Sequence, residues 1–172
     1  MRVLGAILAG GQSRRFGSDK ALAVVGGRRL IDRVADALSS QCDGLIVCGR
    51  EEAGYPCIPD RPGAGLGPLG GLCAALHHGL EHGYSHVLAA PCDIPDLPKD
   101  LLAQLAGQGS TVVLAQPVVG LWECGHASTL AQMLESENRA VMAFADAVAA
   151  RRIVLDRPLG NINRPEDIPD AG

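Results

Sequence analysis

Aromatic residues, long apolar runs and an excess of basic charge are all scarce in this sequence. Only 3% of its 172 residues are aromatic, so a core must be built mainly from Ala, Val, Leu and Ile. No apolar stretch approaches the roughly 20 residues that a membrane helix needs, so we expect no membrane association. The net charge of −4 lacks the basic excess that nucleic acids attract, and small-molecule ligands are expected instead.

The six cysteines form no Cys-x-x-Cys pair, so the sequence contains no such zinc-binding or dithiol redox motif. Most of them lie within apolar runs, where cysteine is typically a small buried hydrophobic residue. Reduced thiols are typical of a reducing compartment, and we therefore expect a cytoplasmic protein. The apolar run from Val3 to Ala9 is too short for a secretion signal and is interrupted by Gly10-Gly11.

The sequence alternates between apolar strands and amphipathic helices. Strands are predicted over residues 3–8, 45–48, 57–59, 86–90, 111–114 and 153–155. Helices are predicted over residues 28–40, 72–83, 99–105, 127–134 and 140–149. This alternation predicts an α/β fold: a single Rossmann-like domain over residues 1–172, with a mostly parallel sheet covered by helices on both faces. Ligands in such sheets bind beyond the carboxyl ends of the strands.

The first of three candidate ligand loops covers residues 8–20 and combines glycines with cations. Glycines let backbone N–H groups surround phosphate oxygens, and Arg15 and Lys20 can neutralise the charge that develops during phosphate transfer. The loop is not a Walker P-loop, because five residues separate Gly11 from Gly17 and Lys20 does not directly follow a glycine. The alternative for this loop is a solvated basic turn.

Two further loops follow predicted strands. The Gly- and Pro-rich segment 63–71 is expected to lead into a helix whose N-terminus closes over a ligand. Asp93 comes shortly after strand 86–90, and a carboxylate there suits Mg²⁺, which takes one or two carboxylates plus substrate phosphates. The alternative for Asp93 is a residue that caps the turn or helix before Pro95.

Five segments are together more specific than any one loop. They are Leu8-Ala9-Gly10-Gly11-x-Ser13-x-Arg15-x-Gly17-x-Asp19-Lys20, Gly67-Pro68-Leu69-Gly70-Gly71, Cys92-Asp93-Ile94-Pro95, Gly120-Leu121-Trp122 and Asn161-Ile162-Asn163-Arg164-Pro165-Glu166-Asp167. In content and order they resemble the molybdenum cofactor guanylyltransferases. The resemblance covers nearly the whole chain. It implies a fold of the nucleotide-diphospho-sugar transferase type and the transfer of GMP from GTP to molybdopterin, with release of pyrophosphate.

The resemblance also implies a Mg²⁺ cofactor, transient contacts with proteins that insert or deliver the molybdenum cofactor, and a role for each matching residue. The roles are catalysis for Arg15, Lys20 and Asp93; nucleotide binding for Leu8, Ala9, Gly10, Gly11, Lys20, Asp60 and Asp93; the molybdopterin side of the cleft for Asn161 and Asn163; and metal binding for Asp93.

Two features bear on the choice of nucleotide. Relatives that use other nucleotides often have alanine at the position of Gly10, so the Gly10-Gly11 pair favours GTP. In contrast, Cys48-Gly49-Arg50 stands where the family can carry an asparagine contact. A cytidylyltransferase or a sugar-phosphate nucleotidyltransferase is therefore the alternative enzyme. A non-catalytic carrier of nucleotide or cofactor is the alternative from a different class.

Overall fold

The computed structural model describes residues 1–10, 20–162 and 165–167. Its centre is a seven-stranded sheet in the order β5-β4-β1-β6-β8-β7-β9. The strands of this sheet are β1 (Val3–Leu8), β4 (Gly44–Cys48), β5 (Cys57–Ile58), β6 (His86–Pro91), β7 (Thr111–Val113), β8 (Gln116–Glu123) and β9 (Arg151–Ile153). The α-helices are α1 (Leu30–Ser39), α2 (Pro68–Glu81), α3 (Leu101–Leu105), α4 (Ala127–Glu135) and α5 (Val141–Ala147).

Most neighbouring strands of the sheet are parallel. β1 pairs in parallel with both β4 and β6, β4 with β5, and β7 with β9. Only β8 among the described strands of this sheet runs against its neighbours, β6 and β7. The predicted mostly parallel sheet is therefore confirmed, but β8 itself was not predicted.

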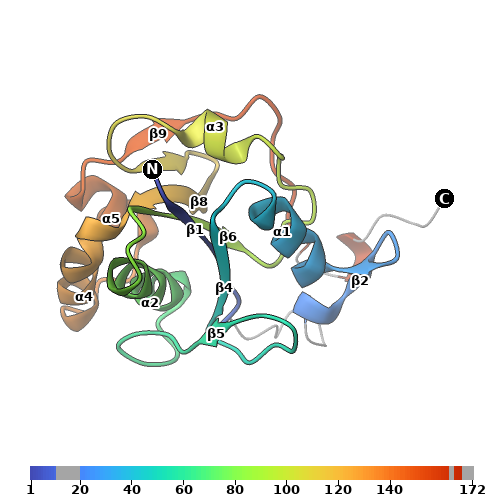
Figure 1. Ribbon diagram of the computed structural model, residues 1–172, viewed down its shortest axis with the longest axis horizontal. Coiled ribbons are helices and arrows are strands. Elements are labelled where there is room, and N and C mark those ends of the chain that lie inside the picture. Colours follow the sequence, from blue (N-terminus) through green and yellow to red (C-terminus); the bar gives the residue numbers. More distant parts are fainter. Residues whose placement is uncertain (11–19, 163–164, 168–172) are drawn as a thin grey trace.

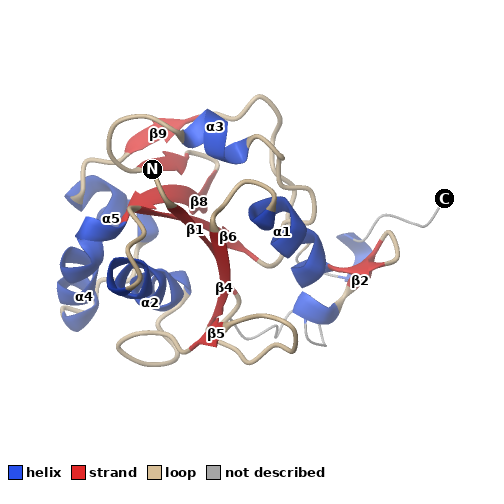
Figure 2. Cartoon of the chain, in the orientation of Figure 1, coloured by secondary structure: helices blue, strands red, loops and turns tan. Residues whose placement is uncertain are grey.

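Helices cover both faces of the sheet, with α1 and α3 on one side and α2, α4 and α5 on the other (Figures 1 and 2). Alternate side chains of β1 point to opposite faces of the sheet, as the period of two in a strand requires. Leu4 packs in the cluster with α2, α4 and α5, whereas Val3 and Ile7 pack in the cluster with α1 and α3. The three-layer prediction is confirmed.

Three helices begin two or more residues away from their predicted starts. α1 begins at Leu30 because Arg28–Arg29 (β3) pairs with Val24–Val25 (β2) in a hairpin. α2 begins at Pro68, so the end of the predicted loop 63–71 is helical. α3 begins at Leu101 rather than at residue 99. Within the described ranges, no helix has the length and apolar character needed to cross a membrane.

Candidate functional site

The carboxyl ends of β1, β4 and β6 meet at one edge of the sheet. Leu8, the last residue of β1, pairs with Cys48 on one side and with Pro91 on the other. The Ala9 N–H continues this contact and donates to the Cys48 carbonyl over 3.0 Å. Both Leu8 and Ala9 are buried, whereas Gly10 is exposed. The chain therefore leaves the core at Gly10, between the loop that follows β4 and the loop that follows β6.

Asp60, which follows β5, lies among four glycines, two in loops and two in the first turn of α2. A Cβ built at Gly10 would be 2.7 Å from Asp60 Oδ2, and a Cβ at Gly49 would be 2.7 Å from Asp60 Oδ1. A Cβ at Gly70 would be 3.3 Å from Asp60 Cβ, and a Cβ at Gly71 would be 3.3 Å from Asp60 Oδ1. A side chain at Gly10 or Gly49 would therefore clash with the carboxylate, and one at Gly70 or Gly71 would fit only tightly. The glycines that the sequence places in separate motifs thus form one cradle around a single carboxylate.

The Asp60 carboxyl group is electrostatically unusual. Its Oδ1 atom is buried and accepts no hydrogen bond from any residue in the described part of the chain. Burial raises the pKa of Asp60 above its ordinary value. A buried acceptor without a donor costs stability, and a ligand that donates a hydrogen bond relieves that cost. Asp60 is therefore suited to accept a hydrogen bond from a hydroxyl or amine group of a ligand.

The segment after β4 is fixed by its backbone and by an ion-pair network. Gly49 has φ of +87° and donates its N–H to the Ile58 carbonyl over 2.9 Å. Arg50 Nη2 lies 3.2 Å from Glu52 Oε2 in an ion pair. Arg29 Nη1 donates a hydrogen bond to Glu52 Oε1 over 2.7 Å. The Glu52 side chain is only 7% exposed, so these cations compensate a largely buried carboxylate. The network holds Arg50 next to the glycine cradle.

Asp93 is attached to the C-terminal segment by two hydrogen bonds. The Ile162 N–H donates to the Asp93 carbonyl over 2.8 Å, and Asn161 Nδ2 donates to Asp93 Oδ2 over 3.3 Å. Gln116 Nε2 in turn donates to Asn161 Oδ1. The structure thus brings together two predicted site residues, Asp93 and Asn161, and adds Gln116, which no sequence motif identifies.

The donor chemistry near Asp93 limits how a metal ion could be held. The described residues contain no group of three or more His, Cys, Asp or Glu side chains that could hold a metal ion. A cation at Asp93 would therefore take most of its ligands from substrate phosphates and water. Mg²⁺ is typically bound in this manner, through one or two carboxylates, so Asp93 fits Mg²⁺ better than a metal that needs a protein cage.

Several predicted site residues are not placed by the structure. Gly11, Arg15 and Asn163 lie outside the described residues. Of Lys20 only the backbone is described, at the start of the short 3₁₀ helix Lys20–Leu22. Trp122, from the Gly-Leu-Trp motif, is fully buried and stacks on Phe144 with ring centroids 4.9 Å apart. That motif therefore contributes to the core.

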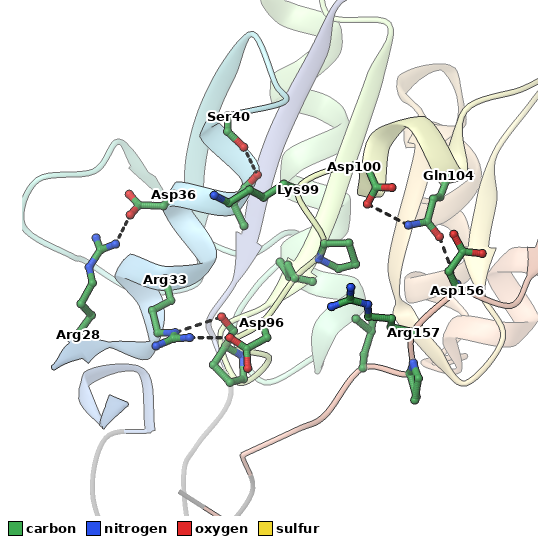
Figure 3. A pocket seen from close by; sticks show the side chains of 16 residues that line it. Arg28, Arg33, Asp36, Ser40, Asp96, Lys99, Asp100, Gln104, Asp156 and Arg157 are labelled. Atoms are coloured by element: carbon green, nitrogen blue, oxygen red, sulfur yellow. Dashed lines mark hydrogen bonds and ion pairs between the residues drawn. The ribbon is translucent and has the colours of Figure 1, made fainter. Parts of the chain in front are cut away.

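A groove borders the Asp93 loop on the side of α1 (Figure 3). Its charged lining residues are the cations Arg28, Arg33, Lys99 and Arg157 and the carboxylates Asp36, Asp96, Asp100 and Asp156. Figure 3 shows Arg28 directed at Asp36 and Arg33 directed at Asp96. Arg33 Nη2 lies 2.5 Å from Asp96 Oδ1. The charges of its described lining residues are balanced and partly paired, so together they give no net positive field for a triphosphate. The glycine cradle is therefore the stronger candidate for a nucleotide site.

Arg33 connects two parts of the site that are distant in sequence. Its guanidinium group donates to the Val25 carbonyl over 3.0 Å and to the Pro95 carbonyl over 3.2 Å. Arg33 thereby joins the hairpin that follows the first loop to the turn that follows Asp93. It was not predicted, because on the sequence it is one of several charged residues on the outer face of a helix.

The chain is similar to known proteins in both sequence and fold. Residues 5–154 match the family described as MobA-like NTP transferase domain. The chain is 34% identical to the molybdenum cofactor guanylyltransferase of Rhodobacter capsulatus, covering 99% of this chain and 95% of that protein. It is 35% identical to the enzyme of the same name from Cereibacter sphaeroides strain ATCC 17029, covering 99% and 96%. The fold is similar to molybdopterin-guanine dinucleotide biosynthesis protein A from Archaeoglobus fulgidus, with a TM-score of 0.78, 21% identity and coverage of 96% and 94%.

Proposed function

This chain belongs to the family of MobA-like NTP transferase domains, and on that premise we propose that it transfers GMP from GTP to molybdopterin. The relatives named molybdenum cofactor guanylyltransferase, which align over nearly their full length, support this choice of substrates. The proposal rests on one observation in this chain. Glycines surround Asp60 at the same edge of the sheet where Asp93 follows β6.

In the proposed reaction, an oxygen of the terminal phosphate of molybdopterin attacks the α-phosphorus of GTP. A new P–O–P bond forms, the bond from the α-phosphorus to the bridging oxygen breaks, and pyrophosphate leaves with that electron pair. The attacking phosphate is already ionised at neutral pH, so the reaction does not require a strong general base. Catalysis then consists mainly of positioning and charge stabilisation.

We assign the nucleotide to Gly10, at the end of β1, and to the side of β1 on which Asp60 lies. Gly10 is exposed and has no side chain, which allows close approach of a nucleotide to its backbone. The buried Oδ1 atom of Asp60 supplies an acceptor for a hydroxyl or amine donor of the nucleoside. Gly49 has no side chain where the family can carry an asparagine contact, so we assign base recognition to its backbone, beside the Arg50 side chain that pairs with Glu52.

We assign the reacting phosphates to the side of β1 that carries Asp93. Asp93 would hold Mg²⁺ together with the phosphates of GTP, and a bound Mg²⁺ supplies charge stabilisation to the phosphoryl oxygens. Lys20 and Arg15 are proposed to stabilise the departing pyrophosphate, and Asn163 to contact molybdopterin, as the resemblance implies. A role in a reducing cytoplasm and transient contacts with cofactor-delivery proteins belong to the same proposal.

The test is pyrophosphate release by the purified protein with molybdopterin supplied, measured for GTP, CTP, UTP and ATP in Mg²⁺ and in EDTA. Mg²⁺-dependent release with GTP alone is expected. Release with CTP instead would keep the reaction type but overturn the choice of base. Tight nucleotide binding without release from any of the four would favour a carrier and contradict the proposed transfer.

A further inference from the structure

Gln116, Asn161 and Asp93 form a chain of two side-chain hydrogen bonds. Gln116 Nε2 donates to Asn161 Oδ1, and Asn161 Nδ2 donates to Asp93 Oδ2 over 3.3 Å. All three residues are half-buried. We propose that Gln116 is a positioning residue that acts through Asn161 to orient the Asp93 carboxylate. This inference rests on the proposed function, in which Asp93 acts at the reacting phosphates.

The direction of both hydrogen bonds follows from the chemistry of the three groups. An ionised carboxylate can only accept, so Asn161 must turn its NH₂ group towards Asp93. The Asn161 amide oxygen then points away from Asp93 and accepts from the Gln116 NH₂ group. Asp93 therefore fixes which way the Asn161 amide faces, and Gln116 holds the amide in that orientation by donating to its oxygen. In the other orientation an amide oxygen would face the Asp93 carboxylate, and the two acceptors would repel each other.

Gln116 comes from β8, the sheet neighbour of the strand that Asp93 follows. It is the first residue of β8, which runs antiparallel to β6 up to the pair of Ala89 and Gly120. Between Gly120 and Gln116 the register of β8 with β7 shifts, and the hydrogen bond to Asn161 connects Gln116 to the Asp93 loop. The strand that sequence patterns did not predict is thus the element that brings Gln116 to the site.

The backbone of the Asn161 segment has an anchor of its own. The Ile162 N–H donates to the Asp93 carbonyl over 2.8 Å. The Ile162 side chain is only 5% exposed and packs with Val25 and Leu30. Loss of the Gln116 amide should therefore leave this segment in place and change only how Asn161 presents its amide to Asp93.

This chain of bonds changes the role expected for Asn161. The resemblance to guanylyltransferases implies a place on the molybdopterin side of the cleft. In the structure the NH₂ group of Asn161 donates to Asp93, and its oxygen accepts from Gln116. Both ends of the amide are thus engaged with the protein, as is typical of residues that orient a metal-binding carboxylate from behind.

Three substitutions at Gln116 separate hydrogen bonding from packing. Gln116→Leu removes the donor at similar size, and Gln116→Glu replaces the donor with an acceptor. Gln116→His restores an N–H, because imidazole Nε2 lies as many bonds from Cα as the glutamine nitrogen. The matched control is Gln104→Leu, because Gln104 is also half-buried but bonds to Asp100 rather than towards Asp93.

The variants are compared by calorimetric GTP binding in Mg²⁺ and in EDTA, by urea unfolding, and by the kcat and the Mg²⁺ requirement of pyrophosphate release. Gln116→Leu is expected to weaken GTP binding in Mg²⁺ about tenfold while leaving binding in EDTA and the urea midpoint unchanged. Gln116→Glu should weaken GTP binding in Mg²⁺ more, because the Asn161 amide oxygen must then face a carboxylate, either at position 116 or at Asp93. Gln116→His should restore most of the loss, and Gln104→Leu should behave as wild type.

Two results would overturn the positioning role. One is wild-type behaviour of Gln116→Leu. The other is an equal loss of GTP binding in Mg²⁺ and in EDTA accompanied by a lower urea midpoint, which indicates a purely structural residue. A wild-type protein without Mg²⁺-dependent GTP binding and pyrophosphate release would instead overturn the proposed function, and the inference with it.

Discussion

The carboxylate of Asp60 lies so close to Gly10 that a Cβ at position 10 would be 2.7 Å from Asp60 Oδ2. The carboxylate cannot easily retreat, because Gly49, Gly70 and Gly71 enclose it on other sides. The absence of a side chain at Gly10 and the position of Asp60 are therefore one structural feature. The sequence-based preference for GTP, which rests on Gly10, thus concerns a position whose side chain would displace Asp60.

Gly10→Ala is expected to displace the Asp60 carboxylate and to lower kcat/KM for GTP by at least about tenfold, or about 1.4 kcal/mol of transition-state stabilisation. The preference for GTP over CTP should narrow in the same variant. Steady-state pyrophosphate release with both nucleotides measures this. Gly63→Ala is the control, because a Cβ at Gly63 would have no described residue within 4 Å. Unchanged kinetics in Gly10→Ala would show that the cradle tolerates a methyl group.

Gly49→Ala is expected to destabilise the fold by about 3 kcal/mol, through a strained positive φ and a steric clash together. Gly49 has φ of +87°, and its Cβ would be 2.5 Å from Gly10 Cα. Gly54→Ala isolates the strain and should cost about 1 kcal/mol, because Gly54 has φ of +92° and a Cβ built there has no neighbour within 4 Å in the described part of the chain. Urea unfolding measures both. Equal losses in the two variants would contradict the close approach of Gly49 and Gly10.

Asp60→Asn is expected to change how stability depends on pH. Burial raises the pKa of Asp60 above its ordinary value of 3.8. Its ionisation therefore destabilises the folded protein as pH rises from that ordinary value through the raised one. The asparagine variant lacks this ionisation, so its stability relative to wild type should increase over that range and level off above it. Urea midpoints of both proteins from about pH 4 to pH 7 test this, and a relative stability that falls with rising pH would contradict it.

Much of the architecture could be predicted because it follows from local patterns. The apolar run Val3–Leu8 is a buried strand, and the glycines after it mark the point where the chain turns out of the sheet, as expected. The start of α2 was predicted too late, because Gly70 and Gly71 are poor helix formers. They occupy the first turn of the helix all the same, where the absence of side chains leaves room for Asp60.

The features that could not be predicted depend on contacts between distant segments. Pro117 lacks the N–H group that a strand in the interior of a sheet donates, so the sequence around it does not predict a strand that pairs with β6. Gln116 therefore had no predicted place near Asp93. Likewise, Arg33 contacts carbonyl groups of a hairpin and a turn that only the folded chain brings together. Motifs identify groups that face a ligand, whereas the residues that hold those groups appear only in the structure.

Asp93→Ala is expected to lower Mg²⁺-dependent pyrophosphate release by at least about a thousandfold, because a bound metal ion stabilises the transition state by several kcal/mol. GTP binding in EDTA should persist, because Asp60 and Asp93 follow strands on opposite sides of β1. Asp96→Ala is the matched control: the Asp96 side chain is 81% exposed, and its ion pair with Arg33 contributes little. Near-normal Mg²⁺-dependent activity in Asp93→Ala would contradict the assignment of the metal to this carboxylate, while loss of GTP binding in EDTA would place the nucleoside on the Asp93 side.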